Sequence, residues 1–292
     1  MVLRAALALL LGMTLVAAPL SAQRPSPTVE GLLRAATDYL ASYAGKVSGV
    51  SLEEEYTIID VSGGRMRTPQ RLNSDVILLN LAGKVIALRD AYAIDSKPLR
   101  ERRPRITALL VSPTETAWQQ AQDYATESFR HLRTDLIMRL NEPTLALQFI
   151  APEQQRLLKY KVGEGRALDG VETVGLVFEE PANRDASYII STRGKAAAKG
   201  WLWIDPATGR IHQTELWMQS ETETARVTVT YAREPKLDLW LPARMVETYD
   251  TTESRGEVSI MGVGNYNIRQ SFQCRAIYSN ARLTPIELAV VK

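Results

Sequence analysis

The spacing of apolar residues predicts a helix near the start of the chain. In "SPTVEGLLRAATDYLASYAGK", 26–46, apolar side chains recur every three or four positions, which is the period of an amphipathic helix. Ser26 is a candidate cap, Pro27 suits the first helical position, and Gly45 suits the last turn. One face of this helix is therefore expected to cover an apolar surface.

A second helix is expected in "SPTETAWQQAQDYATESFRHL", 112–132. Ser112 and Glu115 have the spacing of a capping box, and Pro113 suits the first helical position. Trp118 and Phe129 lie on its apolar face. The preceding "RPRITALLV" can add a shorter helix, so helices interrupt a chain that otherwise favours strands.

Most of the remaining pattern indicates short strands. Between 50 and 98 there are three β-prone runs, and Ala82, Gly83 and Lys84 join the last two as a hairpin. After Pro143 strands follow almost continuously, separated by the turn signals "GEGRALDG", "DPATG" and "SRGE". The stretch 183–200 indicates mostly a mobile loop. The strands expected in this half are 144–150, 156–162, 171–179, 199–204, 211–219, 226–231, 241–249, 257–263 and 271–280.

The segment 199–219 places three of the five tryptophans around a turn. Asp205, Pro206 and Gly209 supply a side chain that can bond nearby amides, a fixed φ and a residue that tolerates positive φ. A hairpin is therefore predicted here.

Both faces of this hairpin carry large apolar groups. Strand alternation puts Trp201 and Trp203 on one face of the incoming strand, and it puts Leu216 and Met218 opposite Trp217 on the return strand. Aromatic residues in strands usually pack across the sheet, which favours core packing. A binding platform remains the alternative, and either face can be the concave one.

The first residues have the layout of a secretory signal peptide. "MVLRAALALLLGMTLVAAPLSAQ" has one early Arg, an uncharged apolar run and small residues before residue 23. Cleavage after Ala22 is expected, with Ala18 as an alternative site and an uncleaved anchor as the other interpretation. Cys274 is the only cysteine, so it cannot pair within the chain and is expected to be a small buried side chain. The protein is thus expected to be exported, to the periplasm or beyond.

Charge and motifs exclude several function classes. The net charge is +2, which argues against a nucleic-acid partner. "RERRPR", 100–105, is the one basic cluster and indicates a solvated face, with anionic lipid head groups as the alternative. Only His131 and His212 are histidines, and no "HExxH", "GxSxG" or Walker loop occurs. No metal, no cofactor and no catalytic nucleophile are expected.

A catalytic function is one alternative. Glu53 and Glu55 share a strand face, with Glu54 on the other face. Paired carboxylates can act as acid and base. A hydrolase would need these residues to meet His212 in one pocket, whereas a charged, solvent-facing strand is the simpler interpretation.

A resemblance can be named on three stretches. "VGEGRALDGVETVGLVFEE", "GWLWIDPATGRIHQTELWM" and "RVTVTYAREPKLDLWLPARMVETYD", with "IYSNARL" at the end, resemble the strand pattern of periplasmic lipoprotein carriers and outer-membrane lipoprotein receptors, the LolA/LolB-like group. The match is loose and covers 160–283. It implies an open, strongly curved antiparallel half-barrel, helices over its concave face, and a cavity for acyl chains. The segment 100–139 and the lack of a lipid-attachment cysteine depart from that pattern.

The sequence therefore predicts an α+β protein: residues 1–22 as a signal peptide and 23–292 as one half-barrel domain, with an N-terminal helix and a helical insertion around 100–139 that cover the concave face. The expected function is non-catalytic binding of an apolar ligand, a lipid or the acyl chains of a lipoprotein. A structural or interaction protein with a filled core is the alternative, and a hydrolase with an unrecognised site is the second. Candidate wall residues are Trp118, Phe129, Trp201, Trp203, Leu216, Trp217 and Met218.

Overall fold

One antiparallel sheet carries the fold. The computed structural model describes residues 27–132, 140–181, 188–189, 196–259 and 262–286, with the side chains of 253–266 excepted. The proposed signal peptide lies outside these residues. The strands are β1 Val50–Asp60, β2 Gln70–Leu81, β3 Lys84–Ile94, β4 Lys97–Pro98, β5 Lys159–Leu168, β6 Val171–Glu179, β7 Ala197–Ile204, β8 Ile211–Gln219, β9 Glu223–Glu234, β10 Leu239–Ser259 and β11 Gly262–Leu283.

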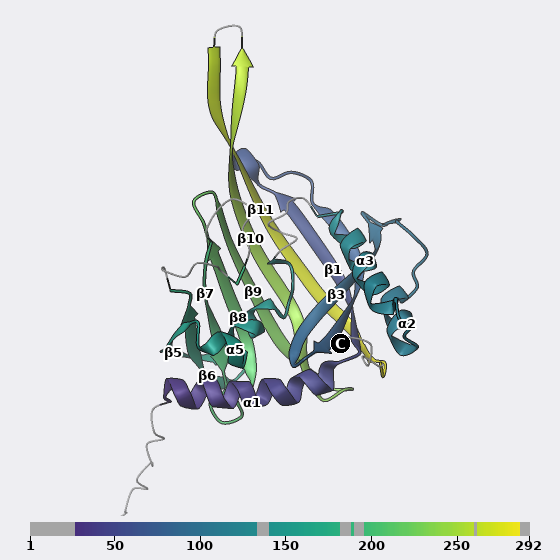
Figure 1. The fold of residues 1–292 in the computed structure, drawn as a ribbon, viewed down its shortest axis with the longest axis vertical. Helices are drawn as coiled ribbons and strands as arrows, with labels where there is room; N and C mark the ends of the chain where they lie inside the picture. Colours follow the sequence, from purple (N-terminus) through teal and green to yellow (C-terminus); the bar gives the residue numbers. More distant parts are fainter. Residues whose placement is uncertain (1–26, 133–139, 182–187, 190–195, 260–261, 287–292) are drawn as a thin grey trace, which may run out of the picture.

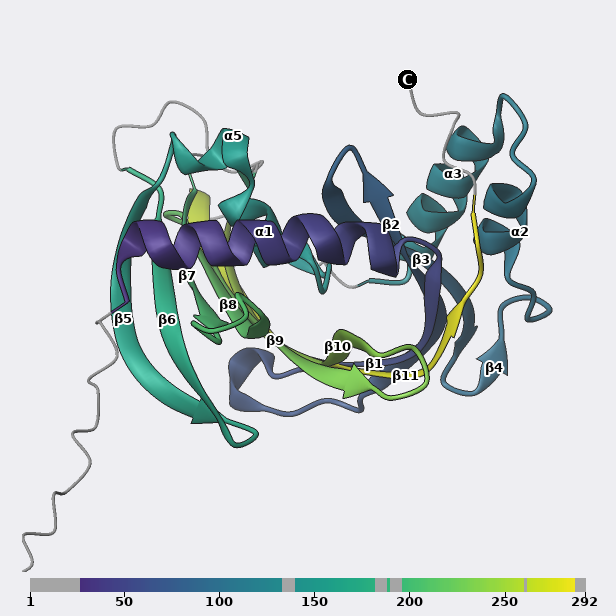
Figure 2. The same cartoon turned by 90° about the horizontal axis from the view of Figure 1, so that it is seen from below.

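The strand order makes an open half-barrel. It runs β4-β3-β2-β1-β11-β10-β9-β8-β7-β6-β5, and the pairings between these neighbours are antiparallel. In the view from below, the sheet curves round a hollow and α1, Val29–Val47, lies across that hollow (Figure 2). The α+β half-barrel expected from the sequence is confirmed.

Further helices lie in the described part of the chain. They are η1 Ser62–Gly64, α2 Arg105–Val111, α3 Ala117–Phe129, η2 Leu145–Ile150 and α5 Pro152–Gln155. None of the helices in the described part of the chain combines the length and the apolar character needed to cross a membrane.

The helix α1 covers the concave face with one apolar stripe. Leu32, Ala36 and Leu40 are buried in the main core cluster together with side chains of the sheet. The helix starts later than expected, because the hydroxyl of Thr28 accepts a hydrogen bond from Gly31 N at 3.1 Å and makes Thr28 the cap. Pro27 therefore precedes the helix, and Ser26 lies outside the described residues.

A second element covers the concave face beside α1. We call residues 140–155, which contain η2 and α5, the cover segment. The strand expected at 144–150 is wrong, since these residues form the 3-10 helix η2 and its run "ALQFI" is buried. Phe149 stacks on Phe178 of β6 with the ring centroids 4.5 Å apart. Periodicity does not distinguish a short apolar run in a buried strand from one in a buried helical turn. The short length of this run favoured a strand, and that assignment was wrong.

The helices α2 and α3 lie on the other face of the sheet. Ile77 and Leu79 of β2 pack with Ile106 and Ala121 in a second cluster, whereas Val76 of the same strand joins the main core. Because successive strand residues point to opposite faces, α2 and α3 cover the outer face of β2 and β3. The expectation that the N-terminal helix covers the concave face is correct. The inserted helices α2 and α3 were expected there too and lie on the outer face instead, whereas the cover segment was not expected as a helix.

The ends of α3 also differ from expectation. The helix begins at Ala117 behind Thr116, whose side chain makes no capping hydrogen bond. The capping box of Ser112 and Glu115 is therefore not formed, and Pro113 precedes the helix. The shorter helix expected in "RPRITALLV" is present as α2.

The turn signals were partly correct. The hairpins β2–β3 and β7–β8 form as expected, and β6 and β8 have the expected bounds. Most of "GEGRALDG" belongs to strand β5, and the chain reverses at its last two residues, Asp169 and Gly170, which both have positive φ. "SRGE" is no turn: β10 runs through it to Ser259, which pairs with Gly262. The loop expected at 183–200 lies largely outside the described residues, and its end belongs to β7.

The end of the long β10–β11 hairpin projects beyond the body of the molecule at the top of the view (Figure 1). The β7–β8 and β9–β10 turns lie at the opposite end, close to α1 (Figure 1). The half-barrel thus has one end that α1 crosses and one end that carries the projecting hairpin.

Gly209 in the β7–β8 turn touches α1. Its φ is +72°, and a Cβ built there would lie 2.0 Å from the carbonyl oxygen of Ala35. Asp205 shapes the turn, since its carboxylate accepts hydrogen bonds from Ala207 N at 2.9 Å and from the hydroxyl of Thr208 at 2.6 Å. The turn can approach the helix this closely only without a side chain at Gly209.

We expect Gly209→Ala to lower the free energy of unfolding by about 2–4 kcal/mol, because the new methyl clashes with α1 and the positive φ is strained. Gly83→Ala is the matched control: its φ is +87°, with no atom within 4 Å of the new Cβ, so only the backbone strain of about 1–2 kcal/mol applies. Urea denaturation of both variants measures the difference. Equal losses would contradict the close contact between the turn and α1.

Candidate functional site

The concave wall includes two of the candidate residues on the hairpin. Leu216 and Met218 of β8 belong to the main core cluster, and each is 2% exposed. Leu202 and Ile204 of β7 face the same side and are buried with them. The structure thus shows which face of the hairpin is concave.

The three hairpin tryptophans lie on the outer face. Trp201 and Trp217 have ring centroids 6.0 Å apart, and the guanidinium of Arg166 lies 5.1 Å from the ring of Trp203. Arg226 lies 4.8 Å from the ring of Trp217. These contacts are cation–π packing on the outside of the sheet, so the three tryptophans do not line the concave side.

A bulge explains one error in the expected faces. Trp203 pairs with Gln213 and Ile204 pairs with Ile211, so His212 is an extra residue opposite this pair. A bulge shifts the alternation of side chains by one position. Ile211 consequently joins the concave core with Leu216, although simple alternation placed them on opposite faces.

The two candidate wall residues on α3 pack against different clusters. Trp118 packs on the second cluster, at the outer face of β2 and β3. Phe129, at the end of the helix, packs against the main core. Of the candidate wall residues, Phe129, Leu216 and Met218 therefore adjoin the concave core.

A buried polar network lies beneath the cover segment. The carboxylate of Glu247 accepts hydrogen bonds from the hydroxyls of Tyr56 at 2.5 Å and Tyr249 at 2.8 Å. It also accepts from the amide nitrogen of Asn141, on the cover segment, at 3.2 Å. Cys274 is buried close by at 3% exposure, as expected, and burial raises the pKa of its thiol.

An ion pair adjoins this network. The guanidinium of Arg89 donates to both carboxylate oxygens of Glu54, at 2.5 and 2.7 Å, and to the carbonyl oxygen of Asn141 at 3.3 Å. Both charged side chains are almost fully buried. Sequence reasoning missed these partners; the available signal was that Glu54 faces away from Glu53 and Glu55, towards the core.

Further hydrogen bonds tie the cover segment to the sheet. Glu142 accepts from Ala87 N at 3.1 Å, and Gln148 donates to the carbonyl oxygen of Val85 at 2.8 Å. The hydroxyl of Tyr231 donates to the carbonyl oxygen of Pro143 at 2.8 Å. The cover segment is therefore held by specific polar contacts at its start and at Gln148, and by apolar packing.

A cleft opens along the seam between α1 and the cover segment. Its volume is about 270 Å³. Leu40 of α1, Val85 of β3, and Leu147 and Ile150 of the cover segment line it, and all four belong to the main core cluster. The seam cleft is therefore an apolar depression that touches the core directly.

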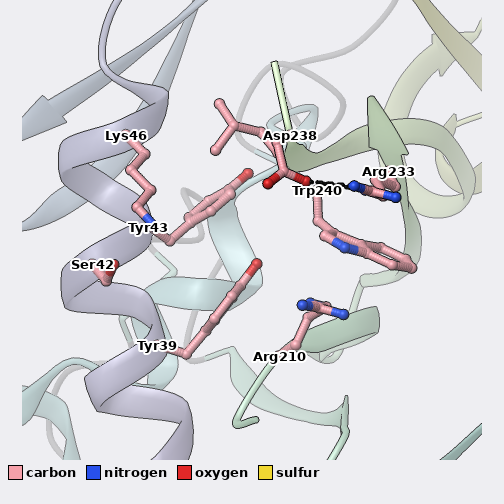
Figure 3. A pocket seen from close by; sticks show the side chains of 9 residues that line it. Tyr39, Ser42, Tyr43, Lys46, Arg210, Arg233, Asp238 and Trp240 are labelled. Carbon is pink, nitrogen blue, oxygen red and sulfur yellow. Dashed lines mark hydrogen bonds and ion pairs between the residues drawn. The ribbon is translucent and has the colours of Figure 1, made fainter. Parts of the chain in front are cut away.

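A second pocket lies at the end of the half-barrel that α1 crosses. We call it the end pocket; its volume is about 480 Å³. Figure 3 shows the side chains of Tyr39 and Tyr43 from α1 on one side, with Arg210 and Trp240 on the other. The remaining lining residues are Ser42, Lys46, Arg233, Asp238 and Leu239.

Burial and charge shape the groups around the end pocket. Burial raises the pKa of Tyr39 to about 12, although the nearby Arg210 opposes the shift. Burial, together with Arg210, lowers the pKa of His212, whose ring packs edge-on against Trp240 with the centroids 4.6 Å apart. His212 is thus a neutral side chain behind the pocket wall.

The residues needed for a hydrolase do not come together. Glu53 binds Arg102 at 2.8 Å and Arg282 on the β1–β11 surface. His212 lies on β8, four strand steps from β1 in the sheet order, which is roughly 19 Å at about 4.8 Å per step. No group of three His, Cys, Asp or Glu side chains in the described part of the chain is arranged to hold a metal ion.

The basic cluster at 100–105 is engaged with carboxylates. Arg100 and Arg105 bind Asp90 at 2.6 and 2.7 Å. Arg103 pairs with Glu101 at 2.6 Å. Asp90 is buried, so of these pairs only Arg103 and Glu101 form the solvated face that was expected. The pairs leave little charge for a lipid head group.

Comparison with known proteins gives a likeness of fold. No protein-family model matches the chain, and no curated protein matches it in sequence. A domain from Vibrio parahaemolyticus named as an outer membrane lipoprotein-sorting protein is similar over 89% of this chain and 96% of its own, at 12% identity and a TM-score of 0.41. A DUF1329 family protein from Desulfovibrio piger is similar over 86% of this chain and 92% of its own, at 12% identity and a TM-score of 0.37.

A LolA superfamily protein from Nitrosomonas europaea is also similar, over 91% of this chain and 97% of its own, at 12% identity and a TM-score of 0.32. These proteins are of the kind that the sequence resembles. At such TM-scores the likeness carries no argument about function, which therefore rests on this chain's own residues.

Glu247 makes stability depend on pH. Burial raises its pKa from 4.5 to about 7, against the hydrogen bonds from Tyr56 and Tyr249 and the charge of Arg89. Because the folded protein holds this proton more tightly than the unfolded chain, the contribution to stability is full below about pH 4.5 and is lost as the pH rises to about 7.

We expect Glu247→Gln to remove a loss on the order of 3 kcal/mol between pH 4.5 and pH 8, since Gln is neutral throughout and keeps an acceptor for the tyrosines. Urea denaturation of both proteins at pH 5, 6, 7 and 8 gives the free energy of unfolding. Parallel pH curves for the variant and the natural chain would contradict a raised pKa of Glu247.

Proposed function

We propose that this chain is an exported envelope protein that binds an apolar ligand, a lipid or the acyl chains of a lipoprotein, without catalysing a reaction. The observation that carries the proposal is the seam cleft. It is an apolar cleft between two separate covering elements, and its lining belongs to the core of a curved sheet. A ligand entering there would replace contacts between the covers and the concave wall.

A ligand of ordinary size would fit the seam cleft only if the covers part. Its volume of about 270 Å³ is below the roughly 300–1,000 Å³ of small-molecule sites. One hydrogen bond joins the two covers directly across the seam, from Gln155 to the hydroxyl of Thr37 at 3.0 Å. The seam is otherwise lined largely by apolar groups, and an entering chain regains about 0.8 kcal/mol for each CH₂ that it buries.

A second candidate function has its own support. Leu216 and Met218 of the sheet and Phe149 of the cover segment are already buried, so the space behind the seam is occupied in this conformation. A protein with a filled core would act through its surface instead, and the projecting end of the β10–β11 hairpin offers one (Figure 1). Lipid binding remains the first proposal because a filled apolar core under separable covers is what a closed carrier requires.

Export is part of the proposal. The early Arg, the apolar run and the small residues before residue 23 support removal of a signal peptide after Ala22. Intact-mass analysis of protein from the cell envelope is expected to give a chain that begins at Gln23. Recovery of the full-length chain in the cytoplasm would refute export.

Filling the seam cleft is expected to weaken lipid binding. Ala41 is an exposed residue of α1 that lines the cleft, so Ala41→Phe puts a ring into the entry at little cost to stability. Calorimetric titration with oleate or a short-chain phospholipid measures the affinity, and we expect about a tenfold loss, which corresponds to about 1.4 kcal/mol.

Gly45→Phe is the control, because it adds the same ring to α1 where no atom lies within 4 Å of the new Cβ. Lipids extracted from the purified native protein are identified by mass spectrometry in parallel. Failure of every lipid class to bind, with no lipid in the extract, would leave the interaction protein as the better account.

A further inference from the structure

We propose that the end pocket binds the anionic head group, a carboxylate or a phosphate, of an amphiphile whose apolar part lies against its aromatic wall. This deepens the proposed function and rests on it, because it names the chemical class of the lipid. It also assigns a site that is distinct from the seam cleft.

The charges around the end pocket favour an anion. Lys46, Arg210 and Arg233 line it together with the single carboxylate of Asp238. Arg233 already donates to Asp238 at 2.8 and 3.1 Å. Among the described residues Arg210 and Lys46 form no salt bridge, although Arg210 lies near enough to Asp205 to lower the pKa of that carboxyl. Two cationic groups that are not bound to a carboxylate therefore line a ligand-sized space.

Arg210 is placed for this role by its neighbours. Its guanidinium lies 4.9 Å from the ring of Trp240, and its Nε is buried with no hydrogen-bond partner among the described residues. Figure 3 shows the side chain extending between Tyr39 and Trp240. A stacked, partly desolvated guanidinium that is not hydrogen-bonded to a carboxylate keeps its donors for an oxyanion.

Tyr43 gives a second, independent observation. The residue is 4% exposed, it lines the end pocket, and its hydroxyl has no hydrogen-bond partner in the described part of the chain. Leaving a buried hydroxyl unsatisfied destabilises a protein. An anionic ligand would accept this hydrogen bond, which explains why a tyrosine stands where a phenylalanine would pack equally well.

The rest of the lining suits an apolar tail next to the anion. Tyr39 stacks on Tyr43 with the ring centroids 5.6 Å apart, and Trp240 and Leu239 line the pocket with them. Aromatic rings combine apolar area with polar tips. A free phosphate or acetate would satisfy the cations and leave these surfaces unused, whereas an amphiphile would use both.

The test compares three probes on the intact mature chain: oleate, its neutral analogue oleyl alcohol, and acetate. Calorimetry gives each affinity, and the emission of Trp240 reports occupancy, with Trp240→Phe identifying its share of the signal. We expect oleate to bind at least tenfold more tightly than oleyl alcohol, since charge-assisted hydrogen bonds to buried donors are the strong ones. Acetate is expected to bind far more weakly than oleate.

Two variants test whether the preference for oleate over oleyl alcohol arises in the end pocket. Arg210→Gln is expected to remove the tenfold preference for oleate and to leave oleyl alcohol unchanged, and Lys46→Gln, at an exposed position of α1, is expected to reduce the preference severalfold. Arg166→Gln is the matched control, because Arg166 also stacks on a tryptophan ring but on the outer face of the sheet. It should leave all three affinities unchanged.

Tyr43→Phe distinguishes a ligand-binding role of the Tyr43 hydroxyl from a purely structural role. It removes the unpartnered hydroxyl, so the unliganded variant is expected to melt at the same or a higher temperature, while its affinity for oleate falls severalfold. A purely structural tyrosine would show a lower melting temperature and an unchanged preference for oleate.

The outcomes distinguish this inference from the proposed function. Equal affinity for oleate and oleyl alcohol would overturn the anion site and leave lipid binding intact. Acetate binding as tightly as oleate would overturn the amphiphile and show a site for a free anion. Absence of binding by both lipids would overturn the proposed function and the inference together.

Discussion

An open, curved sheet with an apolar concave face has to be covered, and most of this structure follows from that constraint. Leu202, Leu216, Tyr249 and Cys274 all face the hollow of the half-barrel and are almost fully buried. A sheet cannot bury its own concave side without closing into a barrel, and this sheet stays open. The burial therefore comes from α1 and the cover segment, which contribute apolar side chains and few backbone contacts with the strands.

The buried polar network makes the position of the cover segment specific. Apolar packing alone would let the cover segment slide, because dispersion contacts have little direction. The hydrogen bonds from Asn141 to Glu247 and from Arg89 to the carbonyl oxygen of Asn141 fix its start. Burying the Arg89–Glu54 pair costs desolvation free energy, so its contribution to net stability is small even though removing one partner would be severe. Its effect is to favour one arrangement of the cover over the others.

Local sequence chemistry was sufficient to predict the β7–β8 hairpin, but it could not predict contacts that depend on how distant residues pair. Asp205 and Gly209 specify their turn through bonds within a few residues, so the turn could be predicted. The bulge at His212 depends on how β7 and β8 pair, and alternation counted along one strand does not reveal it. The extra residue His212 puts Ile211 on the concave face, where simple alternation did not place it. The run "LALQFI" was misassigned because its conformation also depends on what it packs against.

The candidate site was predicted less well than the fold because it depends on contacts between distant segments. The end pocket joins Tyr43 of α1 to Arg210 of the β7–β8 turn and to Trp240 at the start of β10, and no local pattern links them. The tryptophans were conspicuous in the sequence, yet Trp203 and Trp217 pack outside the half-barrel with cations on their rings. A cluster of large residues in one hairpin is therefore a weaker guide to a site than polar groups that distant segments bring to one pocket.

The close approach of α1 to the turns explains why the polar site forms at the end of the half-barrel. Gly209 lets the β7–β8 turn touch Ala35, and Arg210, the next residue, is thereby brought beside Tyr39 of the same helix. Strand ends and turns carry polar and charged residues because their backbone reaches water, whereas the middle of the concave wall has to stay apolar. A helix that crosses the strand ends therefore encloses a charged, aromatic pocket at its flank and an apolar seam along its length. An amphiphile has the same two kinds of surface in the same molecule.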